Sequence, residues 1–208
     1  MLKTISLFIF GLLFTSAIAL AQQPIMPEKL LAQAMNLVEK GQYDQALNLA
    51  KPYAEQGDRE AENLLGYLYQ EAYNNPVEAI KWNKRAAAQG HDVAQFNLGL
   101  NYLNIYDYSS ARKWFEKSAA QGHIAPPLTS LGLLYYYGDG VDRDYVKAAD
   151  YFKRAVDRGD ARGSYYLALC YLNSHGVKQN LAEAKRLLLA AQKAGIPNAA
   201  KKLAELGW

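Results

Sequence analysis

The stretch that decides the fold runs from residue 131 to residue 152 and reads LGLLYYYGDGVDRDYVKAADYF. Its first seven residues are apolar or aromatic apart from one glycine, and its last eight combine alanine and aromatic residues with charged ones. A short acidic segment with two glycines separates the two parts. We therefore expect a helical hairpin, in which two helices are joined by a tight loop.

The same hairpin pattern recurs along the chain. A leucine followed by a small residue returns at spacings of 33, 33, 36 and 36 residues, as Leu65-Gly66, Leu98-Gly99, Leu131-Gly132, Leu167-Ala168 and Leu203-Ala204. The other recurring positions are a tyrosine four residues later (Tyr69, Tyr102, Tyr135, Tyr171), a second-helix alanine (Ala79, Ala111, Ala148, Ala184) and a final glycine (Gly57, Gly90, Gly122, Gly159, Gly195). Such periods are typical of solenoids, in which each hairpin buries its apolar face by stacking on its neighbours.

Each recurring residue type has a physical role in this scheme. A small residue after the leucine lets two helices approach closely, and the second-helix alanine accepts that approach. The leucine and the tyrosine one turn later share a helix face, so we expect tyrosines such as Tyr135 to be buried packing residues. The final glycines are expected to end helices in the left-handed conformation.

The fourth unit resembles the Sel-like repeat (SLR), a relative of the tetratricopeptide repeat, through Leu131-Gly132, Tyr135, Gly138-Asp139-Gly140-Val141 and Lys147-Ala148. The second and third units lack the glycine loop and are more similar to tetratricopeptide units. The resemblance implies an all-α, right-handed solenoid of about five antiparallel helix-hairpin repeats plus a C-terminal capping helix. The expected repeats span about residues 28–57, 58–90, 91–122, 123–159 and 160–195, with the cap at 196–208.

The first residues predict a targeting signal. Lys3 precedes an almost wholly apolar run from Ile5 to Leu20, which closes on Ala19-Leu20-Ala21, a pattern that signal peptidase cuts. A membrane anchor is the alternative, but the run is at or below the roughly 20 residues that cross a bilayer. We therefore expect a signal peptide at 1–21, a repeat domain at 22–208, a periplasmic or secreted protein, and no transmembrane segment after cleavage.

The sequence offers little that could support catalysis. Lys and Arg number 23 against 20 Asp and Glu, interspersed, which gives no reason to expect nucleic acid or an anionic membrane as a partner. The three histidines, His91, His123 and His175, have no metal-ligand spacing and are expected to be solvated loop residues. Cys170 is expected to be a small core residue, and the loop at 138–144 lacks the ligand order of a calcium-binding EF-hand. No catalytic residue, metal or cofactor is predicted.

The resemblance implies that the first helix of each hairpin lines a concave wall that binds another protein or a peptide segment. The positions two before, two after, and five and six after the repeat leucine give an apolar, tyrosine-rich strip. The predicted binding residues are Tyr67, Phe96, Leu100, Leu103, Leu133, Tyr136, Tyr137, Tyr165, Leu169 and Asn173, and the same register also includes Asn63, Gln70, Thr129 and Leu172. The alternative is that tight curvature buries these side chains against neighbouring helices.

The predicted function is a non-enzymatic protein-binding scaffold or regulator in the bacterial envelope. One alternative is a periplasmic immunity protein that neutralises a secreted toxin. A more remote alternative is a β-lactamase-like enzyme, because cysteine-rich secreted members of the family are linked to β-lactam binding or hydrolysis. Those members carry a cysteine pair in each repeat, whereas this chain has one cysteine in total.

Cleavage of the expected signal peptide is directly measurable. Because the small-x-small pattern ends at Ala21, the exported protein should begin at Gln22 when its intact mass is measured. A full-length chain that retains Met1 in the membrane fraction would contradict both the cleavage and the expected location.

Overall fold

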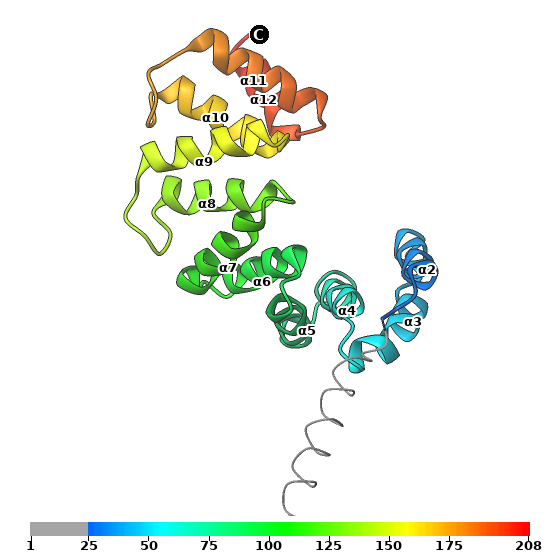
Figure 1. Ribbon diagram of the computed structural model, residues 1–208. Helices are drawn as coiled ribbons and strands as arrows, with labels where there is room; N and C mark the ends of the chain where they lie inside the picture. Colours follow the sequence, from blue (N-terminus) through cyan, green and yellow to red (C-terminus); the bar gives the residue numbers. More distant parts are fainter. Residues whose placement is uncertain (1–24) are drawn as a thin grey trace, which may run out of the picture. The chain divides into compact units, whose positions relative to one another are not determined.

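The computed structural model describes residues 25–208, so the signal peptide expected at 1–21 lies outside the described residues. The described chain contains eleven helices and no strand (Figure 1). The hairpins are α2 (Glu28–Glu39) with α3 (Tyr43–Glu55), α4 (Arg59–Glu71) with α5 (Pro76–Ala88), α6 (Asp92–Asn104) with α7 (Tyr108–Gln121), α8 (Pro126–Tyr137) with α9 (Tyr145–Asp157) and α10 (Ala161–Asn173) with α11 (Leu181–Lys193), followed by α12 (Pro197–Glu205). From residue 25 onward, no helix is both long and apolar enough to cross a membrane.

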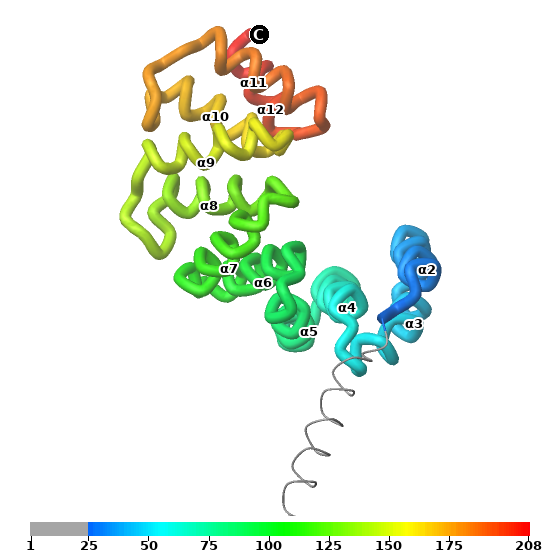
Figure 2. The backbone as a smooth tube through the Cα atoms, in the orientation of Figure 1, coloured from blue at the N-terminus to red at the C-terminus, as the bar shows by residue number. Residues whose placement is uncertain are grey.

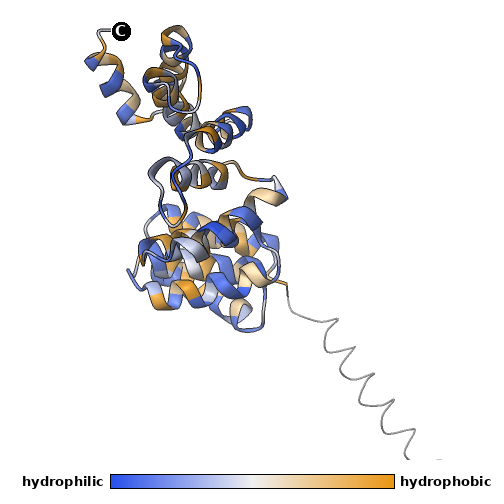
Figure 3. Cartoon of the chain, turned by 90° about the vertical axis from the view of Figure 1, so that its left-hand side faces the viewer, coloured by the Kyte–Doolittle hydropathy of each residue, from blue (hydrophilic) through white to orange (hydrophobic). Residues whose placement is uncertain are grey.

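The chain divides into two compact units, which are described separately below: unit 1 covers the described residues up to His91, and unit 2 covers 92–208. Within each unit every helix contacts the next one along the chain, and the tube turns back at each short loop (Figure 2). In unit 2, α8 also contacts α10. This consecutive packing of helix pairs confirms the all-α hairpin-repeat solenoid. Apolar and polar residues mix along the same helices, as amphipathic helices require (Figure 3).

Local capping residues fix where the helices begin and end. An Asp or Asn side chain accepts a hydrogen bond from a first-turn backbone N–H at Asp58, Asn75, Asp107, Asp144, Asp160 and Asn180. Pro126 occupies the first turn of α8, where its missing N–H costs no helical hydrogen bond. The unit-ending glycines have φ between 78° and 95°, at Gly57, Gly90, Gly122, Gly159 and Gly195. These left-handed conformations confirm the expected helix stops.

The small residue after the repeat leucine is where the two helices of a hairpin meet. A Cβ added to Gly132 would lie 2.4 Å from Cε1 of Phe152, and one added to Gly99 would lie 2.5 Å from Cδ1 of Phe115. The marker alanines of the second helices are fully buried, at Ala79, Ala111, Ala148 and Ala184. The expected close approach is confirmed, and a phenylalanine ring from the second helix fills it.

The core of unit 1 is closed by polar contacts as well as apolar packing. The Met26 side chain is buried, and its backbone N–H donates to Oδ2 of Asp58 at 3.0 Å. Glu62 is 1% exposed, and its Oε1 lies 2.7 Å from Nε of Arg85. Burial raises the pKa of the Glu62 carboxyl, whereas the Arg85 charge acts in the opposite direction. The ion pair therefore compensates part of the cost of burying this carboxylate.

The last helix covers the end of the core of unit 2. Ala199 and Leu203 of α12 are buried in one apolar cluster with Leu187 and Leu188 of α11. The outer side of α12 carries an ion pair in which Nζ of Lys202 lies 2.6 Å from Oε2 of Glu205. This arrangement confirms the capping helix expected at the C-terminal end.

The contact between Gly132 and Phe152 predicts that replacing this helical glycine with alanine lowers stability, the opposite of the usual effect. Gly→Ala inside a helix ordinarily stabilises by about 1 kcal/mol. At Gly132 the added methyl group would overlap the Phe152 ring, so we expect Gly132→Ala to destabilise by roughly 1–3 kcal/mol in thermal or urea unfolding.

The same substitution made in a Phe152→Leu variant tests the cause of that destabilisation. In a chain that carries Phe152→Leu, the smaller side chain makes room, and the cost of Gly132→Ala should fall below about 1 kcal/mol. A stabilising Gly132→Ala in the unmodified chain would show that the two helices do not approach this closely.

Candidate protein-binding site

The predicted binding residues fall on both units. Tyr67 lies in unit 1 and is 42% exposed, whereas the other nine lie on α6, α8 and α10 of unit 2. Tyr137, at 59% exposed, and Asn173 are the exposed members of that group, and the other seven are half-buried. Thr129, which the same register places on the wall, is buried, and its hydroxyl donates to Oδ2 of Asp160 at 2.6 Å. The prediction that Thr129 lines the concave wall is therefore wrong.

Four tyrosines lie on the contacting helices α8 and α10 and are here called the tyrosine cluster: Tyr136, Tyr137, Tyr165 and Tyr166. The ring centroids are 5.2 Å apart for Tyr136 and Tyr137, and 5.1 Å apart for Tyr165 and Tyr166. Burial raises the pKa of the Tyr137 hydroxyl, and the hydroxyls of Tyr166 and Tyr165 add to that rise. Tyr137 therefore presents an uncharged phenol group at neutral pH.

Tyr136 is a packing residue within this cluster. Its ring contacts Phe152, Tyr145 and His175, and its hydroxyl oxygen lies 2.9 Å from Nδ1 of His175. Burial raises the pKa of Tyr136 to about 12. The sequence predicts a binding role for Tyr136, but the structure leaves it only half-exposed because the α8–α9 and α10–α11 hairpins close around the ring. Its neighbour Tyr137 is the side chain that projects into solvent.

The α6 members of the predicted strip also serve the core. Phe96, Leu100 and Leu103 are half-buried and pack against a buried cluster that includes Phe115 and Leu131. The centroids of the Phe96 and Phe115 rings are 5.7 Å apart. For these three residues, the alternative that the side chains pack against neighbouring helices is the correct one. The part of the predicted strip best suited to contact a partner is the tyrosine cluster with Leu169 and Asn173.

The repeated tyrosines are less buried than the sequence predicts. Tyr69, Tyr102, Tyr135 and Tyr171 each pack against a buried cluster, but all four keep part of their surface exposed. The Tyr135 ring stacks on that of Tyr151 at 5.8 Å between centroids. The expected packing role is therefore confirmed, whereas the burial of these rings is only partial.

The histidines differ from one another. His91 is 8% exposed, and its Nε2 lies 3.0 Å from Oε2 of Glu60, so its expected solvation is wrong. His175 is half-buried and stacks on Tyr145 with 4.0 Å between centroids. His123 is exposed, as expected, beside Asp92. The sequence places all three histidines in loops, but contacts with other repeats decide how far each is buried.

Cys170 is fully buried, which confirms its role as a core residue, and burial raises the pKa of its thiol to about 12. Among residues 25–208 there is no group of three or more His, Cys, Asp or Glu side chains placed to hold a metal ion.

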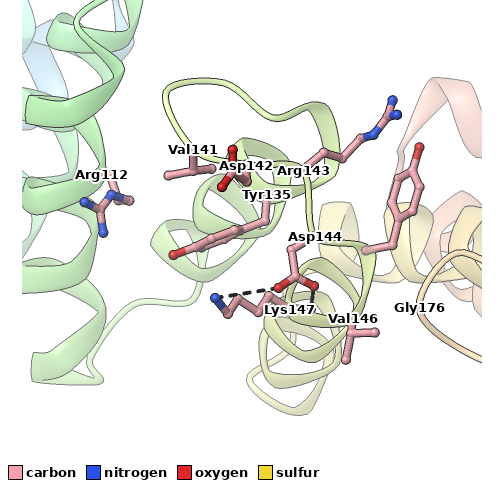
Figure 4. Close-up of a pocket in the computed structure, with 10 residues that line it drawn as sticks. Arg112, Tyr135, Val141, Asp142, Arg143, Asp144, Val146, Lys147 and Gly176 are labelled. Carbon is pink, nitrogen blue, oxygen red and sulfur yellow. Dashed lines mark hydrogen bonds and ion pairs between the residues drawn. The ribbon is translucent and has the colours of Figure 1, made fainter.

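Sequence reasoning missed a cavity of about 780 Å³ in unit 2, beside the α8–α9 loop (Figure 4). Its volume is within the range of small-ligand sites, roughly 300–1,000 Å³. It is lined by Arg112, Tyr135, Val141, Asp142, Arg143, Asp144, Tyr145, Val146, Lys147 and Gly176. From the sequence, the loop at 138–144 could be compared only with calcium-binding loops. The sequence did not show that Arg112 of α7 lines the same cavity as this loop.

The stacked antiparallel hairpins define an α-helical hairpin-repeat protein. The Sel1 repeat profile matches residues 59–91, 92–123, 128–160 and 161–195, which together make up more than half of the chain. The chain belongs to the Sel1 repeat family. Members of this family are in general protein-interaction scaffolds and are typically non-enzymatic.

Similar proteins support this assignment. A solved Sel1 repeat protein from Oxalobacter formigenes is 30% identical, with a TM-score of 0.74, over 84% of this chain and 74% of that one. A protective antigen of uropathogenic Escherichia coli with an SLR fold is 28% identical, with a TM-score of 0.69, over 77% of this chain and 36% of that one. The ERAD-associated E3 ubiquitin-protein ligase component HRD3B of Arabidopsis thaliana is 36% identical over 99 residues, which are 47% of this chain and 16% of that protein. The chain thus spans about a sixth of the length of this curated relative.

Substitutions of the adjacent residues Tyr136 and Tyr137 can distinguish a packing role from exposure on the surface. Tyr136→Ala should destabilise the protein by roughly 2 kcal/mol, less than the 3–5 kcal/mol typical of a fully buried aromatic residue, because the ring is half-buried among four aromatic neighbours. Tyr137→Ala should change stability by less than about 0.5 kcal/mol, because most of that ring faces solvent. Thermal unfolding of both variants measures the difference, and equal losses would contradict the separate roles.

Proposed function

We propose that this protein is a non-enzymatic adaptor of the bacterial envelope that binds a protein partner through the tyrosine cluster of α8 and α10. The observation that carries the proposal is the exposure of Tyr137, 59% of its surface, next to the half-exposed rings of Tyr136 and Tyr165. Aromatic side chains with a polar end give a large contact area at a small cost in conformational entropy, and they are enriched among residues that dominate binding.

The surroundings of the cluster support a protein partner. Asn173 is exposed beside Leu169, and its Nδ2 donates to the Leu169 carbonyl at 2.9 Å, which holds the amide in place. Such a surface combines tyrosine rings, which are enriched at protein interfaces, with an amide held by a hydrogen bond. The family assignment favours the same conclusion, because Sel1 repeat proteins in general bind other proteins.

The envelope location rests on the N-terminal sequence. Lys3, the apolar run that follows it and the Ala19-Leu20-Ala21 pattern are typical of an exported protein. An exported scaffold would meet its partner outside the cytoplasm. The search for a partner therefore has to be made in the periplasmic fraction of living cells.

Site-specific photo-crosslinking in living cells tests both the surface and the partner. A photoreactive phenylalanine analogue at position 137 should give a defined crosslinked product in the periplasmic fraction. The matched control is position 189 on α11, where Leu189 is also exposed, at 45%, but lies away from the cluster in sequence and helix. Once crosslinking has identified the partner, its co-purification with alanine variants that carry no crosslinker measures the contribution of each side chain. We expect Tyr137→Ala to lower the amount of co-purified partner about fivefold and Leu189→Ala to leave it unchanged.

The identity of the crosslinked protein then decides the finer role. A secreted lipase or peptidoglycan hydrolase as partner would make the protein an immunity protein rather than an adaptor. Equal crosslinking at positions 137 and 189, or no product at 137 across several growth conditions, would contradict binding through the tyrosine cluster.

A further inference from the structure

The positive charge of the protein is concentrated in the segment that contains its last two helices. Residues 178–208 carry six Lys and Arg against two Glu, a net side-chain charge of +4. Residues 92–177 carry nine charges of each sign, and residues 25–91 carry seven Lys and Arg against nine Asp and Glu. The near balance of the whole chain therefore conceals a local excess of cations at α11 and α12, which favours an anionic partner at this end of unit 2.

The two acidic residues of this segment already have cationic partners. Oε1 of Glu183 lies 2.6 Å from Nη2 of Arg186, and Oε2 of Glu205 lies 2.6 Å from Nζ of Lys202. These hydrogen bonds lower the pKa of both carboxyls, so both stay ionised and paired at neutral pH. Within the described part of the chain no ion pair involves the other four cations, which are all exposed: Lys178, Lys185, Lys193 and Lys201. Four ammonium groups are thus available to an anion outside the chain.

Leucine and lysine alternate along the outer face of α11. Leu181, Lys185, Leu189 and Lys193 follow one another at intervals of four residues, so they form one stripe along the helix. All four are exposed, Leu181 at 52% and Leu189 at 45%, whereas the opposite face of α11 belongs to the core of unit 2. The outer face of α11 therefore presents separate apolar side chains between cations.

The last residue of the chain lies beside this face. Nζ of Lys185 is 5.7 Å from the centre of the Trp208 ring, which is half-buried against the core of unit 2. The neighbours of α11 are α10 and α12, and they leave the stripe open to solvent (Figure 1). Tryptophan is enriched at the boundary between membrane and water, and helices that lie on membranes combine lysine on one side with leucine or tryptophan.

We propose that the outer face of α11, with the Trp208 ring beside it, docks on an anionic phospholipid surface. The lysine ammonium groups contact the lipid phosphates, and the side chains of Leu181 and Leu189 enter the apolar edge of the leaflet. The long aliphatic stem of lysine lets its charge stay among the headgroups while the leucines between the lysines go deeper.

The spacing of the leucines favours a lipid over an acidic protein. The centre of a protein interface is a contiguous patch with few charges, whereas the leucines of this stripe are separated by lysines. A fluid leaflet accommodates each leucine separately and surrounds each ammonium group with phosphates. This surface shares no residue with the tyrosine cluster and does not rest on the function proposed for that cluster.

Co-sedimentation of the purified exported protein with lipid vesicles tests the proposal. The probes are vesicles of phosphatidylcholine alone, vesicles of phosphatidylcholine and phosphatidylglycerol in equal amounts, and soluble polyglutamate, which offers anions without an apolar layer. We expect the mixed vesicles to bind at least about tenfold more tightly than either other probe, and added salt to weaken that binding. Equal binding to both kinds of vesicle, no binding to the mixed vesicles, or equally tight binding to polyglutamate would overturn the proposal. The last result would identify an acidic protein as the occupant.

Three variants separate the stripe from the overall charge of the protein. Lys185→Glu should weaken binding to the mixed vesicles by about tenfold or more, and Leu189→Asn by about threefold or more. Lys84→Glu, on α5 of unit 1, changes the net charge by the same amount as Lys185→Glu and should leave binding unchanged. All three replace exposed side chains, so thermal unfolding should match that of the parent protein closely. If Lys84→Glu weakens binding as much as Lys185→Glu, or Leu189→Asn has no effect, the stripe is not a lipid-docking surface.

Discussion

The contact between the two helices of a hairpin, at the residue after the repeat leucine, is the constraint on which the other features depend. Gly132 has no side chain, so the Phe152 ring lies directly against the backbone of α8, and Gly99 and Phe115 repeat the arrangement. This contact sets the separation of the two helices. The separation in turn decides which faces of the hairpin remain for the next hairpin to cover, and stacking supplies most of the buried apolar surface in such arrays.

Loop length adds a second layer of packing in unit 2. The connection between α6 and α7 covers residues 105–107, whereas the one between α8 and α9 covers 138–144. The longer loop reaches back to Tyr108 through Gly140, and the next one reaches Tyr145 through Gly176. A short turn could not make either contact. Residues 141–144 of the first loop and Gly176 of the second line the cavity described above, together with Arg112 and Tyr135.

The tyrosines illustrate how one residue type occupies both packed and exposed positions on the same helix. Tyr136 and Tyr137 are consecutive on α8, but only Tyr136 has rings from α9 and a histidine from the α10–α11 loop around it. Burial raises the pKa of both hydroxyls, so both remain neutral hydrogen-bonding groups over the physiological pH range.

Much of the fold was predictable from the sequence because it depends on local chemistry. The repeat spacing, the helix stops at glycines such as Gly159, the start of α8 at Pro126 and the buried position of Cys170 follow from residue type, helical periodicity and backbone conformation. The candidate site was only partly predictable. The register identified Tyr137, but it gave the same role to Tyr136 and placed Thr129 on the surface.

Those differences arise from contacts between residues far apart in the chain. His175 contacts Tyr136 across 39 residues, Glu60 contacts His91 across 31, and Arg112 of α7 lines the same cavity as residues 141–144 of the α8–α9 loop. A repeat pattern states which residue types recur but not what each meets in the neighbouring repeat. The sequence by itself therefore determined the helices, their pairing and their ends, whereas the tertiary structure alone decided which side chains are covered and where a cavity forms, because burial depends on the packing of non-local surfaces.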